Sequence, residues 1–134
     1  MTNHQAHLGD ARFLRLEIDR TVAVAVVLEA LAMRCDDLET RRACTRVAGG
    51  QMRQVRRLQT LFLRKAGHGH RVPGMCPYVP TCLGTLWLIC VEMQTGAARL
   101  DAYAEVARCA QVQRLCRTLA IGRAKAAREL EAFL

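Results

Sequence analysis

The sequence predicts an all-α fold, an antiparallel four-helix bundle made of two similar αα-hairpins in one domain over 1–134. Hydrophobic residues make up 51% of the chain and aromatic residues only 4%, a balance that favours helices over strands. Apolar residues recur every three to four positions over long segments. One segment, 67–81, holds all three prolines and is the one clear long loop.

The first helix is predicted over 10–35. Asp10 is a suitable N-cap residue, and Asp36 followed by Glu39 has the capping-box spacing that opens the next helix. One face between these points carries Leu14, Glu17, Thr21, Val24, Leu28, Leu31 and Cys35. We expect this face to point into the core.

The second helix is predicted over 38–65, and Gly67 ends it. Its predicted buried stripe consists of Cys44, Ala48, Gln51, Val55, Leu58 and Phe62. The opposite face carries a basic stripe of Arg42, Arg46, Arg53, Arg57 and Arg64. This basic stripe must face solvent or a partner.

The third and fourth helices are predicted over 83–108 and 111–134, although neither Gly nor Pro separates them. The third stripe is Leu86, Cys90, Met93, Ala97, Leu100 and Ala104. The fourth stripe is Val112, Cys116, Leu119, Arg123, Ala126, Leu130 and Phe133.

An internal repeat predicts the break between these two helices. A shift of 72 positions pairs Cys44 with Cys116, Ala48 with Ala120, Gly50 with Gly122 and Leu58 with Leu130. A shift of 74 pairs Phe13 with Trp87, Leu14 with Leu88 and Cys35 with Cys109. The chain is therefore expected to divide into a hairpin over 10–66, a loop over 67–82 and a hairpin over 83–134.

The first hairpin opens with an Asp-x-x-Phe-Leu motif and carries spaced glutamines in its second helix. The residues concerned are Asp10, Phe13, Leu14, Gln51, Gln54, Val55, Leu58, Leu61 and Phe62. In these features 10–66 resembles the bacterial ferritin-like four-helix-bundle domains of unknown function, which implies a ferritin-like bundle. Arg20 and Thr21 stand where some such families have a His-His pair, and no Glu is followed three residues later by His. We therefore expect no ferritin-type iron site.

Seven candidate metal ligands are expected at one end of the bundle. This near end holds the start of the first helix and the end of the second, and on this prediction also the start of the third. The candidates are His4, His7, His68, His70, Met75, Cys76 and Cys82. Thiolate, thioether and imidazole groups together suit zinc or copper. A zinc or copper site is one hypothesis; a loop whose histidines and thiols bind nothing is the other.

Two further groups of residues are expected to meet inside the bundle. At the opposite, far end, the four thiols of Cys35, Cys44, Cys109 and Cys116 should approach one another, with core filling favoured over ligation. Halfway along, a polar layer should gather Thr21, Gln51, Met93 and Arg123, with Glu17 and Glu92 near enough to neutralise the guanidinium. Setting the helix register is favoured over anion binding for this layer.

The charge pattern supports a second functional hypothesis. Twenty Lys and Arg against twelve Asp and Glu give a net charge of +8, which permits anionic partners. The hypothesis is a non-enzymatic interaction or assembly module with a basic Arg-striped face and reduced structural cysteines, acting in a homo-oligomer or with a protein partner. Nucleic acid is less favoured, because no aromatic residues interleave with the arginines. No catalytic spacing or phosphate loop predicts an enzyme.

A cytoplasmic location is expected. The first residues lack the features of a secretory signal, and no uncharged apolar run approaches the roughly 20 residues that span a bilayer. Seven cysteines, an odd number, argue against a complete disulfide framework, so reduced thiols are predicted.

Overall fold

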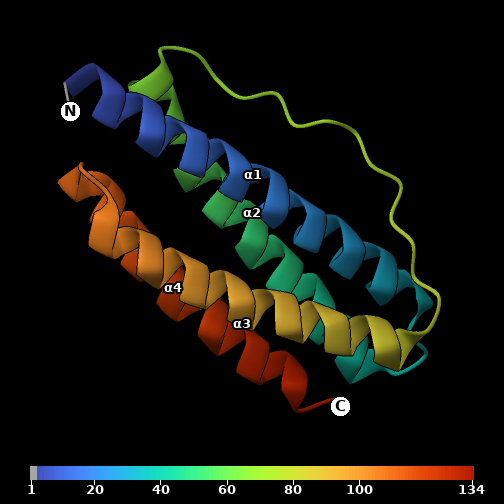
Figure 1. The fold of residues 1–134 in the computed structure, drawn as a ribbon. Helices are drawn as coiled ribbons and strands as arrows, with labels where there is room; N and C mark the ends of the chain where they lie inside the picture. The colour runs from blue at the N-terminus through green and yellow to red at the C-terminus, as the bar shows by residue number, and fades with distance from the viewer. Residues whose placement is uncertain (1–2) are drawn as a thin grey trace.

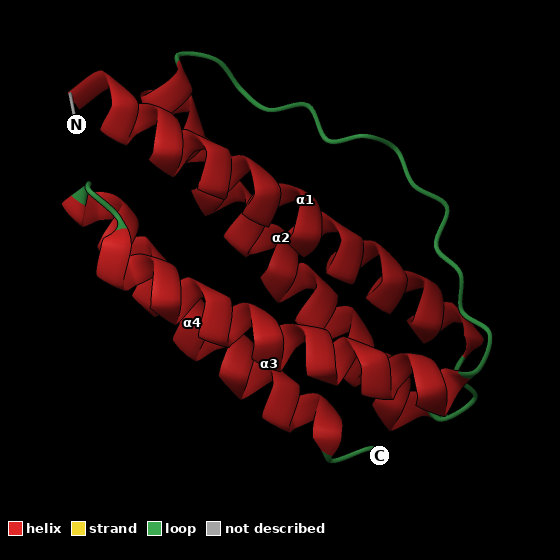
Figure 2. Cartoon of the chain, viewed as in Figure 1, coloured by secondary structure: helices red, strands yellow, loops and turns green. Residues whose placement is uncertain are grey.

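The structure is a computed structural model that describes residues 3–134, with side chains described from Gly9 onward. Four helices form the chain (Figure 1): α1 (Asn3–Arg34), α2 (Leu38–Ala66), α3 (Cys82–Val106) and α4 (Ala110–Glu131). No strand occurs within 3–134 (Figure 2). The all-α prediction is therefore confirmed, and α3 and α4 are separate helices joined by a short turn over 107–109.

The helices pack as two hairpins. The contact is close between α1 and α2 and between α3 and α4, and the hairpins meet more sparsely along α1–α3 and α2–α4. Helix α1 therefore lies diagonally opposite α4. Helices in contact run antiparallel (Figure 1).

The predicted stripes are buried, as their spacing requires. Every residue of the α1, α2 and α3 stripes is buried, and in α4 only Ala126 and Phe133 are half-buried. All five arginines of the basic stripe of α2 are exposed. The apolar side chains form two clusters, one toward each end, with polar side chains between them.

The connection between the hairpins runs in a direction that the sequence does not predict. The loop over 67–81 crosses the whole length of the bundle, so α3 begins at the far end (Figure 1). The expectation that α3 starts at the near end is wrong. Fifteen extended residues reach about 50 Å, enough to span the 29 residues of α2, which measure about 43 Å. Three prolines favour that extended conformation.

Helix α1 also begins earlier than Asp10, so the predicted N-cap role of this residue is wrong. Asp10 lies inside the helix and is 2% exposed. Its carboxylate accepts a hydrogen bond from the Tyr103 hydroxyl at 2.7 Å and another from the Cys109 backbone N–H at 3.2 Å. The Tyr103 ring stacks on Phe13 with centroids 3.7 Å apart. Asp10 thus ties α1 to the end of α3 and the start of α4 at the near end.

A buried polar layer joins all four helices halfway along the bundle. Glu17 of α1, which is fully buried, accepts hydrogen bonds from Arg123 of α4 at 2.9 Å and from Arg99 of α3. Arg123 also donates to Gln54 of α2 at 3.1 Å and to the Thr21 hydroxyl. No buried side-chain N or O atom among the described residues lacks a partner. The predicted layer around Arg123 is therefore confirmed.

Glu17 and Arg123 are both charged and form an ion pair. Burial by itself raises the pKa of Glu17, but the hydrogen bond from Arg99 and the charge of Arg123 outweigh burial, and the pKa of Glu17 lies below its ordinary value. Burial lowers the pKa of Arg123, which the charge of Glu17 opposes. An arginine stays protonated at neutral pH despite such a shift.

Replacing Glu17 by leucine should lower the free energy of unfolding by about 3–5 kcal/mol, because it leaves the Arg123 guanidinium buried without a carboxylate. The double variant Glu17→Leu, Arg123→Met should recover most of that loss, since both charges are then gone. Urea denaturation followed by circular dichroism measures both. If the double variant is less stable than the single one, the two substitutions act through packing and the ion-pair account fails.

Candidate functional site

Two of the predicted metal ligands, His68 and His70, lie at the near end. Both rings meet Phe62 edge-on, with centroids 5.7 and 5.8 Å away. His70 Nε2 lies 2.7 Å from Asp19 Oδ1, and the His70 backbone N–H and C=O pair with the side-chain amide of Gln59 at 3.1 and 2.6 Å. The observed contacts of His70 therefore anchor the loop to α1 and α2.

The remaining ligands do not join these histidines. Met75 and Cys76 are exposed along the loop, and Cys82 lies at the far end, where its thiol donates to the Arg34 carbonyl at 3.5 Å. The side chains of His4 and His7 lie outside the described residues.

The expected convergence is therefore wrong for Cys82, because the loop carries this residue to the end opposite His68 and His70. Among the side chains described from residue 9 onward, no three or more His, Cys, Asp or Glu are arranged to hold a metal ion.

The thiols are also divided differently from the prediction. All seven cysteines are free. Cys35, Cys44, Cys82 and Cys90 gather in the far-end cluster, whereas Cys109 and Cys116 belong to the near-end cluster. We expected Cys35 and Cys44 to approach Cys109 and Cys116, and this expectation is wrong. Because α3 starts at the far end, its last turn lies at the near end, and Cys109 and Cys116 lie there with it.

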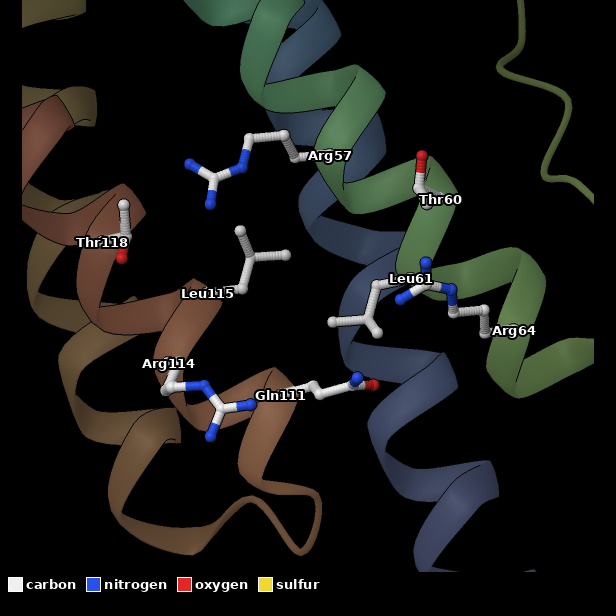
Figure 3. Close-up of a pocket in the computed structure, with 8 residues that line it drawn as sticks. All are labelled: Arg57, Thr60, Leu61, Arg64, Gln111, Arg114, Leu115 and Thr118. Carbon is white, nitrogen blue, oxygen red and sulfur yellow. The ribbon is translucent and has the colours of Figure 1, made fainter.

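A surface hollow lies where α2 and α4 meet. Toward the near end it encloses about 480 Å³ between the two helices. Arg57 and Arg64 of α2 and Arg114 of α4 line it, and Leu61 and Leu115 lie between them (Figure 3). Both leucines are more than nine-tenths buried, so they form an apolar floor beneath the three guanidinium groups.

A second hollow of about 570 Å³ continues along the same two helices and shares Arg57 and Thr118 with the first. Arg46, Arg53 and Lys125 line it, with Glu129 as the one carboxylate. We refer to the two hollows together as the α2–α4 groove. The first turn of α2 lies beyond its far end.

The groove has a strong excess of positive charge. Arg46 pairs with Glu129 at 2.6 Å. The other five basic residues of the groove form no ion pair with a carboxylate of the described chain; they are Arg53, Arg57, Arg64, Arg114 and Lys125. Like charges held together without counter-charges produce a positive potential that attracts anions.

The predicted basic stripe covers only the α2 side of this groove. Arg114 and Lys125 on α4 were not part of the predicted basic stripe. A signal for them is present in the repeat, because the shift of 72 positions places Arg114 opposite Arg42 and Lys125 opposite Arg53. When two similar hairpins pack side by side, equivalent positions of their helices can border the same groove.

The polar layer itself has no room for a ligand. Thr21, Gln51, Met93 and Arg123 line one internal space, as predicted, but that space measures only about 10 Å³. A single water needs at least that much. The preference for a register-setting role over an anion site is consistent with this volume.

Comparison with protein-family models, with curated proteins and with solved structures finds no match for this chain. Over the described residues, no helix is both long and apolar enough to cross a membrane. Function must therefore be inferred from the groove and the thiols themselves.

One thiol has the surroundings of a reactive cysteine. Cys109 is the N-cap residue of α4 and is half-buried. Burial raises the pKa of Cys109, but the hydrogen bond from Lys65 and the backbone N–H groups of Val112 and Gln111 outweigh it, so this pKa lies below its ordinary value. Burial raises the pKa of Cys116, by contrast, to about 12.

Alkylation by iodoacetamide at neutral pH should therefore modify Cys109 well before Cys116, because only the thiolate reacts. Lys65→Met should slow the reaction at Cys109 by roughly threefold to tenfold as its thiolate fraction falls. Lys125→Met, on the exposed groove, is the matched control and should leave the rate unchanged. Site-resolved mass spectrometry in a Cys76→Ser background measures each rate; equal rates at Cys109 and Cys116 would contradict the assignment.

Proposed function

We propose that this protein is a non-enzymatic interaction module that binds an acidic segment of a protein partner in the α2–α4 groove. The observation that carries the proposal is the lining of the groove, which combines six basic side chains and one carboxylate over an apolar floor. An acidic partner would supply the missing counter-charges.

The charge excess supports binding rather than a structural role. A structural arginine in this protein has buried partners, as Arg123 has in Glu17. Arg57 and Arg114 are exposed instead, and neither pairs with a carboxylate of the described chain. Complementary charges across an interface accelerate association and help to select the partner.

The apolar floor favours an amphipathic helix as the bound segment. Leu61 and Leu115 offer a narrow strip of apolar surface between the two rows of basic side chains. A helix with apolar residues on one face and Glu or Asp at its borders satisfies both features, as in other helix-in-groove interactions. A second copy of the chain is a poor occupant, because each copy carries a net charge of +8.

Nucleic acid fits this groove less well. No aromatic side chain lines either hollow, so bases would have no ring on which to stack. A zinc or copper role through His68, His70, Cys76 and Cys82 has less support than the groove, since the loop separates Cys82 from both histidines.

We also propose that the bundle has the ferritin-like arrangement. One long lengthwise connection between two hairpins is a feature of ferritin-like bundles. The path of the loop from the end of α2 to the far end of the bundle supports this classification (Figure 1).

Charge reversal in the groove should weaken binding to an acidic amphipathic peptide. The probe is a helical peptide of about 18 residues with Leu on one face and Glu beside it, matching the roughly 27 Å of α2 between Arg46 and Arg64. Arg57→Glu with Arg114→Glu should raise the Kd by about tenfold or more, equivalent to about 1.4 kcal/mol. Added salt should weaken the wild-type complex. Fluorescence anisotropy measures both effects.

The matched control is Arg12→Glu with Arg15→Glu, which changes the net charge equally at exposed positions of α1 outside the groove. Its Kd should change by less than about threefold, and both variants should keep the wild-type circular dichroism spectrum. If the two variants weaken binding equally, net charge alone accounts for the interaction and the groove has no specific role. Tighter binding of a single-stranded oligonucleotide than of the peptide would contradict the proposed partner class.

A further inference from the structure

Three helix ends bring cysteines together at the far end of the bundle. Cys35 directly follows α1, Cys82 is the first residue of α3, and Cys44 lies in the second turn of α2. Cys35 and Cys44 are buried and Cys82 is half-buried. Cys35 and Cys82 line the same pocket, and the Cys82 sulfur lies 3.5 Å from the carbonyl oxygen of Arg34, the residue before Cys35. Cys44 is close enough to Cys35 and Cys82 to interact with them electrostatically.

The Cys35–Cys82 pair is accessible from outside. A pocket of about 230 Å³ opens beside both residues, between the ends of α1 and α3. Leu86 and Phe133 form an apolar side of this pocket, and Arg34 and Asp37 lie at its border. A small ion can therefore reach two thiols that are otherwise enclosed by the core.

Charged groups of both signs border the pair. Arg41 donates from Nε to the Cys35 carbonyl at 3.0 Å, which holds its guanidinium next to this residue, and Arg34 lines the pocket. Asp36 and Asp37 also line the pocket, and the hydrogen bonds from Thr40 lower the pKa of Asp37, so this carboxylate keeps its charge. The two guanidinium groups and the two carboxylates therefore balance one another.

We propose that the reduced protein binds one copper(I) ion between the sulfur atoms of Cys35 and Cys82. Copper(I) is a soft cation that prefers thiolate ligands. It is satisfied by two or three of them, whereas zinc requires four donors in a tetrahedral shell. Cys35 and Cys82, which line one pocket, offer the two sulfur donors that copper(I) requires and not the four that zinc requires. This site is independent of the α2–α4 groove.

Binding is an exchange of protons for metal and involves no oxidation. Two thiols lose their protons to solvent, two copper–sulfur bonds form, and the resulting copper dithiolate carries one negative charge. Arg34 and Arg41 supply positive charge beside this group, and Asp36 and Asp37 supply negative charge. Because protons leave when the ion binds, the apparent affinity rises with pH.

The free pair resists becoming a disulfide instead. Burial, and then the neighbouring Cys82 and Cys44 thiols, raise the pKa of Cys35 to about 11. A protonated thiol is a poor nucleophile and oxidises slowly. The same proton is displaced when a metal with strong affinity for sulfur arrives.

Anaerobic titration of the full chain with copper(I), in competition with a chromophoric copper(I) chelator, tests the proposal. We expect one tightly bound ion per chain. Cys35→Ser and Cys82→Ser should each lower the affinity for copper(I) by more than about 100-fold. Loss of a residue that only contacts a ligand lowers metal affinity by roughly 10–100-fold. Cys76→Ser, at the exposed loop cysteine, is the matched control and should bind as the wild type does.

Two further readouts separate ligation from folding. X-ray absorption of the loaded protein should show a shell of sulfur atoms only, and the affinity should rise with pH. Cys82→Ser alters a half-buried residue at a helix start, so it tests the site even if Cys35→Ser unfolds the chain. Wild-type affinity in a folded Cys82→Ser variant, loss of binding on Cys76→Ser, or a nitrogen-dominated shell would each overturn the proposal.

Discussion

The ion pair of Glu17 with Arg123 is the interaction on which the arrangement of the helices depends. It crosses the diagonal of the bundle from α1 to α4, and its other hydrogen bonds reach α2 through Gln54 and α3 through Arg99. Shifting α1 or α4 by a turn would leave a charge buried without its partner, which costs several kcal/mol. Shifting α2 or α3 would remove a hydrogen bond that the pair makes with Gln54 or with Arg99. The apolar clusters on either side can repack, but the charged layer has only this one register.

Helix positions were predictable because each helix carries its own signal. The burial of Leu14, Leu58 and Leu130 follows from spacing within a single segment. The direction of the loop has no comparable signal, since a loop that folds back and one that crosses the bundle leave the same stripes buried. The path taken decides which end holds Cys82. The prediction that Cys82 joins the histidines of the near end is therefore wrong because of the topology.

The internal repeat correctly predicted the break between α3 and α4, but it relates the buried faces of one pair of helices more closely than those of the other. At a shift of 72, Cys44 and Cys116 are both fully buried, so α2 and α4 present equivalent faces. At a shift of 74, Leu14 is fully buried whereas Leu88 is 59% exposed. Half of the groove could therefore be predicted from the arginines of α2. The α4 half of the groove could be predicted only if the shift of 72 positions, which relates buried residues, is applied to exposed residues as well.

Arginine has opposite roles in this protein, and the neighbouring backbone helps to decide between them. Arg123 reaches Glu17 past Gly96 of α3, where an added Cβ would lie 2.9 Å from Arg123 Nη1. Any larger residue at 96 would push the guanidinium away from its carboxylate. Arg57, by contrast, is exposed and lines the groove, so its charge remains at the surface. Gly96 of α3 and Arg123 of α4 are distant in sequence, yet the buried ion pair depends on both. The basic groove, by contrast, is formed by arginines that have no comparable carboxylate within reach.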